Sequence, residues 1–184
     1  MLKFNRYSTL AVWMLPLILT AMSQPVFSQT DEQVDAARLK AIDFIRKQQE
    51  TDGHWSYTGH DTGITALCTL ALIENGTAIY DPVVEKGYRY VKKNGPERKE
   101  TYDIALSILL LARVGDRQDR PLIRALGAKL LAGQLVTGGW TYTCPDVDAS
   151  ILQDVKKIKR KEGAGCNSNT QFGEIGRASC RERV

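Results

Sequence analysis

The chain has 184 residues, with 25 Lys and Arg against 21 Asp and Glu and a formal net charge of +4. Its hydrophobic content of 43% and charged content of 25% are ordinary for a globular protein and exclude a chain that is disordered throughout. The length is sufficient for one domain with a buried core.

The first 28 residues have the layout of a secretory signal peptide. Lys3 and Arg6 supply positive charge, and residues 10–21 are mostly apolar. Small residues predict cleavage near Ser28, with an alternative site at Ala21-Met22-Ser23. An uncleaved anchor is the competing interpretation, but the apolar run is short for a bilayer span of about 20 residues. We expect an exported protein, periplasmic or secreted, with no stable membrane span after cleavage.

Residues 174–184 read EIGRASCRERV and can be back-translated to a string that resembles a common sequencing adapter read in frame. We predict that this tail is not native, the alternative being a natural basic tail. The signal and the tail together carry five basic and two acidic residues, so the net charge without them falls from +4 to +1. The net positive charge of the whole chain therefore gives no support for a nucleic-acid partner.

Two segments of the chain repeat at an offset of 39 residues. Ile64–Gly76 aligns without a gap with Asp103–Gly115, and the same offset carries Pro82 onto Pro121. Each unit predicts a helical hairpin, in which Gly ends an apolar helix and Pro begins an amphipathic one, with Asp81 as a cap in the first unit. We expect the apolar helices to form an inner row and the amphipathic helices an outer row.

The predicted outer helices cover Pro82–Asn94 and Pro121–Gln134. An earlier amphipathic helix is predicted over Glu32–Gln49. Its apolar stripe consists of Val34, Leu39, Ile42 and Ile45. Asn167–Phe172 predicts the start of a third inner helix, which we expect to be cut off where the tail begins.

Two helices are predicted to end in the same pattern, Gln-x3-Gly-x-Trp, with a Tyr two residues after the Trp. The residues are Gln49, Gly53, Trp55 and Tyr57 in the first copy and Gln134, Gly138, Trp140 and Tyr142 in the second. The pattern resembles the QW-type motif of squalene–hopene cyclases, oxidosqualene cyclases and prenyltransferase β-subunits, and the resemblance covers residues 33 to about 172. It implies an all-α fold, an α/α toroid of inner and outer helices over residues 29–173, truncated at its C-terminus. In that family the Gln and Trp are structural, and we interpret the aromatic residues here as stacking at outer-helix ends.

The known chemistries of proteins with this toroid do not carry over to these residues. The Asp-x-Asp-Asp acid of terpenoid cyclases is matched only by Asp146 and Asp148, because Ala149 stands at the fourth position, and we interpret this segment as a solvated loop. The spacing of the prenyltransferase zinc ligands is absent, and the Cys–Gln spacing of complement-like thioesters is wrong at Cys166. The candidate zinc ligands by residue type are His54, His60, Asp61, Cys68, Cys144 and Cys166. We assign no catalytic residue, no metal and no cofactor.

The starts of the inner helices are the best remaining candidates for a site, because in such a barrel they face the mouth of the cavity. These residues are His60, Asp61, Thr62, Tyr102, Asp103, Asn167, Asn169 and Gln171. The alternative for each is structural: Asp61 and Thr62 are good N-caps, and an acid at Asp103 suits a helix start.

Two further features concern export and function. Cys144 and Cys166 flank one loop and are a candidate disulfide in an exported chain, and Asn75-Gly76-Thr77 has the form of a glycosylation sequon. We expect a non-catalytic member that binds a small apolar ligand or a protein partner through the toroid. The alternative is a terpenoid-cyclase or prenyltransferase-like enzyme whose catalytic residues lie in a missing C-terminal part.

Overall fold

The computed structural model describes residues 30–148, 154, 156 and 158–183, so the predicted signal peptide lies outside the described residues. These residues form six α-helices and two short 3-10 turns, and only isolated β-bridges occur among them. The predicted all-α class is confirmed. The chain divides into two compact parts, residues 1–38 and 39–184. Helix α2 (Asp31–Lys47) begins in the first part and ends in the second.

The described residues of the first part form the start of α2. Thr30 accepts a hydrogen bond from the Gln33 backbone N–H at 3.3 Å, and the Gln33 side chain accepts one from the Thr30 N–H at 3.2 Å. This reciprocal pair is a capping box, which satisfies two backbone donors that a helix start leaves unpaired. One turn later, Arg38 and Asp35 form an exposed ion pair.

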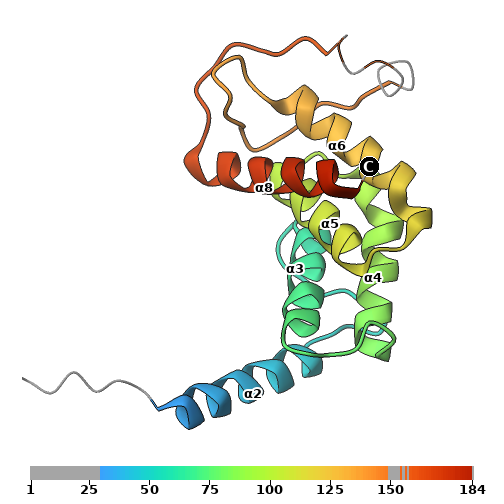
Figure 1. Cartoon of the computed structure of the whole chain (residues 1–184), viewed down its shortest axis with the longest axis vertical. Coiled ribbons are helices and arrows are strands. Elements are labelled where there is room, and N and C mark those ends of the chain that lie inside the picture. The colour runs from blue at the N-terminus through green and yellow to red at the C-terminus, as the bar shows by residue number, and fades with distance from the viewer. Residues whose placement is uncertain (1–29, 149–153, 155, 157, 184) are drawn as a thin grey trace, which may run out of the picture. The chain divides into compact units, whose positions relative to one another are not determined.

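The second part contains two rows of helices. The first row consists of α3 (Asp61–Glu74), α5 (Thr101–Val114) and α8 (Asn167–Arg183), in which α5 packs between the other two. The second row consists of α4 (Pro82–Asn94), which packs on α3, and α6 (Arg120–Gly133), which packs on α5 (Figure 1). The 3-10 turn η1 (Gly95–Glu97) connects the α3/α4 hairpin to α5, and η2 (Arg117–Asp119) connects α5 to α6 within the second hairpin. The predicted helical hairpins are therefore present.

The helix ends follow the predicted Gly and Pro signals. Asp81 caps α4 by accepting from the Val83 N–H at 3.0 Å, and Pro82 occupies the first helical position. Gly115 ends α5 with φ of 78°, a left-handed conformation that costs glycine little. Helix α6 begins one residue before Pro121.

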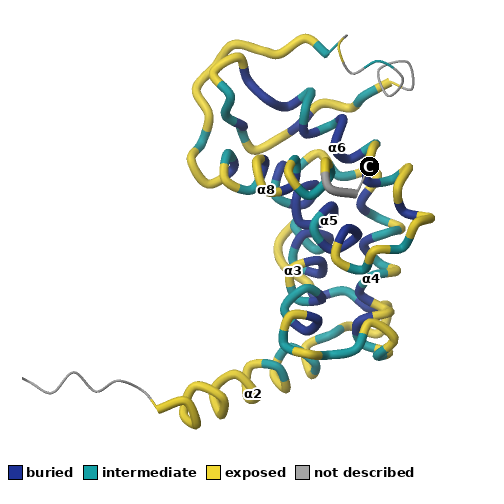
Figure 2. The backbone as a smooth tube through the Cα atoms, in the orientation of Figure 1, coloured by how far each residue is buried: buried dark blue, intermediate teal, exposed yellow. Residues whose placement is uncertain are grey.

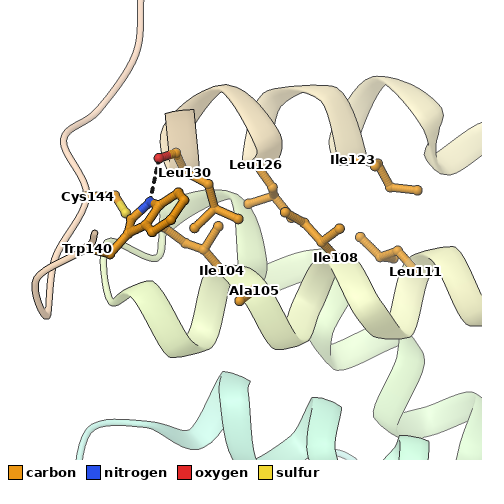
Figure 3. Close-up of a cluster of buried hydrophobic side chains, with 9 residues drawn as sticks. All are labelled: Ile104, Ala105, Ile108, Leu111, Ile123, Leu126, Leu130, Trp140 and Cys144. Atoms are coloured by element: carbon orange, nitrogen blue, oxygen red, sulfur yellow. Dashed lines mark hydrogen bonds between the residues drawn. The ribbon is translucent and has the colours of Figure 1, made fainter. Parts of the chain in front are cut away.

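Helix α5 is shared by two hydrophobic clusters. Ile104, Ile108 and Leu111 of α5 pack against α6 and Trp140 (Figure 3). Leu106 and Leu110, on another face, pack into a cluster formed by Trp55, α3 and α4. Figure 2 shows α5 as mostly buried. A helix with core on more than one side explains why this sequence is apolar almost all round.

The predicted apolar stripe of α2 is only partly buried. Ile42 and Ile45 pack against the cluster around Trp55, whereas Val34 is 49% exposed and Leu39 is 59% exposed. The predicted helix is present as α2, and the second half of its apolar stripe is the half that packs on the core. Within the described ranges, no helix combines the length and apolar content that crossing a bilayer requires.

Helix α8 does not stop where the predicted non-native tail begins. It runs from Asn167 to Arg183 and places Gly176 against Ala105 of α5. The Ala, Arg and Glu residues of the tail are good helix formers, which explains why the helix continues through it. That this tail is not native stays a prediction.

Candidate ligand pocket

The first Gln/Trp pattern forms a compact turn, which we call the first Trp turn (residues 49–55). The Gln49 side-chain amide donates to the carbonyls of Gly53 and Val83, each at 2.9 Å. The Trp55 indole N–H donates to the carbonyl of Ile45 at 2.8 Å. The turn therefore ties the end of α2 to the start of α4. Gly53 has φ of 97°, which a residue with a side chain rarely adopts.

The second Trp turn (residues 134–140) repeats these hydrogen bonds at the end of α6. Gln134 donates to the carbonyl of Gly138 at 2.9 Å, and the Trp140 indole donates to the carbonyl of Leu130 at 2.7 Å (Figure 3). Trp140 is fully buried. In both turns the Gln and Trp side chains therefore hold the end of the preceding helix by hydrogen bonds to backbone carbonyls.

Each Trp turn is also joined to the first-row helix that follows it. The Trp55 backbone N–H donates to the Thr65 hydroxyl of α3 at 3.0 Å. The Trp140 N–H donates to the Thr170 hydroxyl of α8 at 3.1 Å. Thr65 and Thr170 are therefore equivalent positions, and the two turns orient the N-terminal ends of α3 and α8 in the same way.

An open pocket of about 330 Å³, which we call the α3/α5 pocket, lies at the N-terminal ends of the first-row helices. Its residues come from α3, α5, α8 and the loop before α3. They are Tyr57, His60, Gly63, Ile64, Leu67, Tyr102, Asp103, Leu106 and Phe172. Most of the lining is apolar, with a few polar groups at one side, which is the usual composition of a small-molecule site.

The 39-residue repeat explains the apolar wall of the pocket. Leu67 of α3 and Leu106 of α5 occupy the same position in the two repeats, and both line the pocket. Phe172 of α8 adds a third apolar side chain, and its ring lies 4.7 Å from that of Tyr102, centroid to centroid. Successive first-row helices thus present equivalent positions to one surface.

The polar side of the pocket is a His–Asp pair. The His60 Nδ1 lies 3.2 Å from Oδ1 of Asp103, which is only 1% exposed. Its other oxygen, Oδ2, is buried without a hydrogen bond in the described structure. Burial raises the pKa of Asp103, and the hydrogen bond with His60 opposes that shift. A Cβ at Gly63 would lie 2.4 Å from Oδ1, so glycine makes room for this carboxylate.

Asp61 and Thr62 do not cap α3 as predicted. The N-cap residue is His60, whose side chain makes no cap hydrogen bond. Asp61 instead accepts from the Tyr57 backbone N–H at 2.7 Å, which fixes the loop before the helix. Thr62 is buried. Asp61 therefore does not act as the N-cap, because its carboxylate accepts the hydrogen bond of the Tyr57 amide in the loop.

The predicted candidates therefore separate into two groups. His60, Tyr102 and Asp103 line the pocket, whereas Asn167 and Gln171 are exposed and Asn169 is fully buried elsewhere. The apolar wall is absent from the prediction, which places Tyr57 in a stack at a helix end, whereas in the structure Tyr57 lines the pocket. The alignment of Leu67 with Leu106 was the signal that could have located the wall.

The predicted disulfide between Cys144 and Cys166 is absent from the structure, where both are free thiols. Cys144 is buried against Gly133 and Thr101, and burial raises its pKa. Cys166 lies just before α8, where hydrogen bonds from Ser168 and Asn169 lower its pKa to about 6. The pKa values of the two thiols shift in opposite directions because Cys144 lies in the core and Cys166 lies at a helix start.

The other polar candidates have structural partners. Asp146 is exposed and pairs with Lys99 at 2.6 Å and Lys129 at 3.2 Å, and Ala149 lies outside the described residues. His54 Nδ1 lies 2.5 Å from Asp52, and its ring stacks on Tyr90. In the part of the chain that the structure describes, no group of three His, Cys, Asp or Glu side chains is arranged to hold a metal ion.

Comparison with protein-family models, with curated proteins and with solved structures gives no significant match to this chain.

Proposed function

We propose that this chain is an exported, non-catalytic protein of the terpenoid-cyclase and prenyltransferase repeat type that binds a small apolar ligand. The observation that carries the proposal is the α3/α5 pocket, whose apolar wall is formed by equivalent positions of successive helices. Its volume is at the lower end of the range of roughly 300–1,000 Å³ that is typical of ligand pockets.

The toroid is part of this proposal. The two stacked hairpins, the two Trp turns and the shared position of Leu67 and Leu106 support a ring in which the first-row helices face a common lumen. In such a ring the α3/α5 pocket would lie on the inner wall, near the opening of the lumen.

Export is proposed from the N-terminal sequence, with cleavage near Ser28. Expression of the whole chain in a secreting host, followed by mass spectrometry of the product, tests it. We expect a mature N-terminus at Gln29 or shortly after Ser23. Recovery of intact Met1 in the exported or membrane fraction would contradict the proposal.

Binding is tested with decyl methyl ether, an apolar probe that offers no hydrogen-bond donor. We expect saturable binding by titration calorimetry, weakened about 5-fold by Leu67→Ser, because the variant removes apolar area from the pocket wall. Ile79→Ser is the matched control, since Ile79 is an exposed apolar residue outside the pocket. Equal effects of the two substitutions, or no binding, would contradict the proposed site.

A second candidate, a terpenoid-cyclase or prenyltransferase-like enzyme, is favoured by one observation. Asp103 is a buried carboxyl at the wall of an apolar pocket, and burial raises its pKa, as proton transfer to an apolar substrate requires. Genomic sequence across residue 173 would give the native continuation and show whether it encodes an Asp-x-Asp-Asp segment. Squalene conversion by that longer protein, abolished by Asp substitution in the segment, would favour the enzyme over the binder.

A further inference from the structure

We infer that the α3/α5 pocket selects apolar alcohols, through a hydrogen bond from the ligand hydroxyl to Nε2 of His60. The inference rests on the proposed binding function and specifies the ligand class for that same pocket. The ligand would place its apolar body against Leu67, Leu106 and Phe172 and its single hydroxyl at the His60 side.

The hydrogen-bonding state of His60 follows from its partner. An ionised carboxylate only accepts hydrogen bonds, so the contact between Asp103 Oδ1 and His60 Nδ1 requires the hydrogen to be on Nδ1. In the neutral imidazole the other nitrogen, Nε2, is then an acceptor. Among the described residues, Nε2 has no hydrogen-bond partner.

The position of Asp103 makes it a positioning residue for His60. Its carboxylate is buried between α5 and the backbone of Gly63, so it has little freedom to turn away from the imidazole. His60 itself is 45% exposed and lines the pocket. The pocket therefore combines an apolar wall with one accessible hydrogen-bond acceptor, Nε2 of His60. The contact with Asp103 determines the tautomer of this imidazole.

This arrangement distinguishes ligands by whether they donate a hydrogen bond. A hydroxyl can donate to Nε2, whereas an ether or a ketone of the same shape brings a lone pair against a lone pair. One neutral hydrogen bond corresponds to a difference of about 3- to 10-fold in affinity. The apolar wall contributes the same binding free energy to the alcohol and to the ether, so it does not affect the ratio of their affinities.

The first experiment compares n-decanol with its isomer nonyl methyl ether on the full chain by titration calorimetry. We expect n-decanol to bind about 3- to 10-fold more tightly. His60→Phe should bring this ratio close to one and leave the affinity for the ether nearly unchanged. Leu67→Ser should weaken both probes by the same factor and leave the ratio unchanged, because Leu67 contacts only the apolar body.

The second experiment reads the tautomer directly. The chain has only two histidines, so ¹⁵N NMR of the imidazole rings can resolve each. We expect His60 to carry its hydrogen on Nδ1. Asp103→Asn should move His60 toward the Nε2–H form and reduce the preference for n-decanol by at least half. Asp52→Asn is the matched control, because it alters the analogous partner of His54 outside the pocket.

The outcomes separate this inference from the proposed function. Equal binding of n-decanol and the ether, both weakened by Leu67→Ser, would overturn the hydroxyl selection and leave the apolar pocket standing. A preference for n-decanol that survives His60→Phe would also overturn it. Absence of binding by either probe would remove the proposed function and this inference together.

Discussion

The two Trp turns form the same internal hydrogen bonds but stand in different surroundings. In the first, Gln49 bridges to the carbonyl of Val83 on the next second-row helix in addition to Gly53. In the second, the Gln134 side-chain amide donates only to Gly138 among the described residues, and its Oε1 is buried without a partner. The Gln/Trp pattern thus closes the preceding helix in both turns, whereas a Gln bond to a neighbouring helix is present in the first turn alone among the described residues.

The connections that follow the two turns differ even more. Helix α3 begins six residues after Trp55, whereas residues 141–166 separate Trp140 from α8. Both Trp backbone amides nevertheless donate to a threonine of the next first-row helix. The threonine contact therefore sets the position of that helix, and the length of the connection does not.

The largest effects are expected at the tryptophans. Trp140→Ala and Trp55→Ala should each lower the free energy of unfolding by about 3–5 kcal/mol, because each leaves a cavity and an unpaired helix carbonyl. Urea denaturation measures both. A loss below about 1 kcal/mol at either site would mean that the two turns are not equivalent in the core.

The glutamines should separate the two turns. Gln49→Ala is expected to cost about 2 kcal/mol and Gln134→Ala about 1 kcal/mol, because Gln49 satisfies two carbonyls and Gln134 only one. The same urea titrations apply. Equal losses would show that the bond to Val83 adds nothing to the first turn.

The threonines test the link to the following helix. Thr65→Val and Thr170→Val keep the side-chain shape but remove the hydroxyl that accepts from the Trp amide. We expect a loss of about 1–2 kcal/mol at Thr65, which is fully buried, and a smaller loss at Thr170, which is partly exposed. Unchanged stability in both variants would refute the positioning role of the threonines.

The smallest effect is expected at the ion pair between Arg46 and Asp81. The hydrogen bonds from Arg46 lower the pKa of Asp81, so the pair stabilises the fold above the ordinary pKa of an aspartate and is lost as the pH falls through the lowered value. Asp81→Asn, which can still cap α4, should cost up to about 1 kcal/mol at neutral pH. The difference from the parent chain should begin to shrink as the pH falls below about 4 and should disappear below the lowered pKa of Asp81. A difference independent of pH would assign the effect to capping.

The sequence predicted the hairpins well because their signals are local. Asp81 before Pro82 and the glycine at 115 determine helix ends whatever packs around them. The pocket wall and the His60–Asp103 pair depend on contacts between helices, which no local signal defines. Residues 60 and 103 are 43 apart in the chain, and an offset of 39 aligns Asp103 with Ile64 rather than with His60.

The disulfide prediction failed for a related reason. Spacing around a loop shows that two cysteines are near each other in sequence, but the packing of Cys144 under Gly133 is a property of the folded core.

The central claim, that the α3/α5 pocket binds the apolar ligand, is tested most directly by isotope-filtered NMR with n-decanol bound to the methyl-labelled full chain. The account predicts nuclear Overhauser contacts from the decyl chain to the methyl groups of Leu67 and Leu106, which lie on the pocket wall. Contacts confined to methyl groups outside the pocket, such as those of Leu131 and Val136, would contradict it.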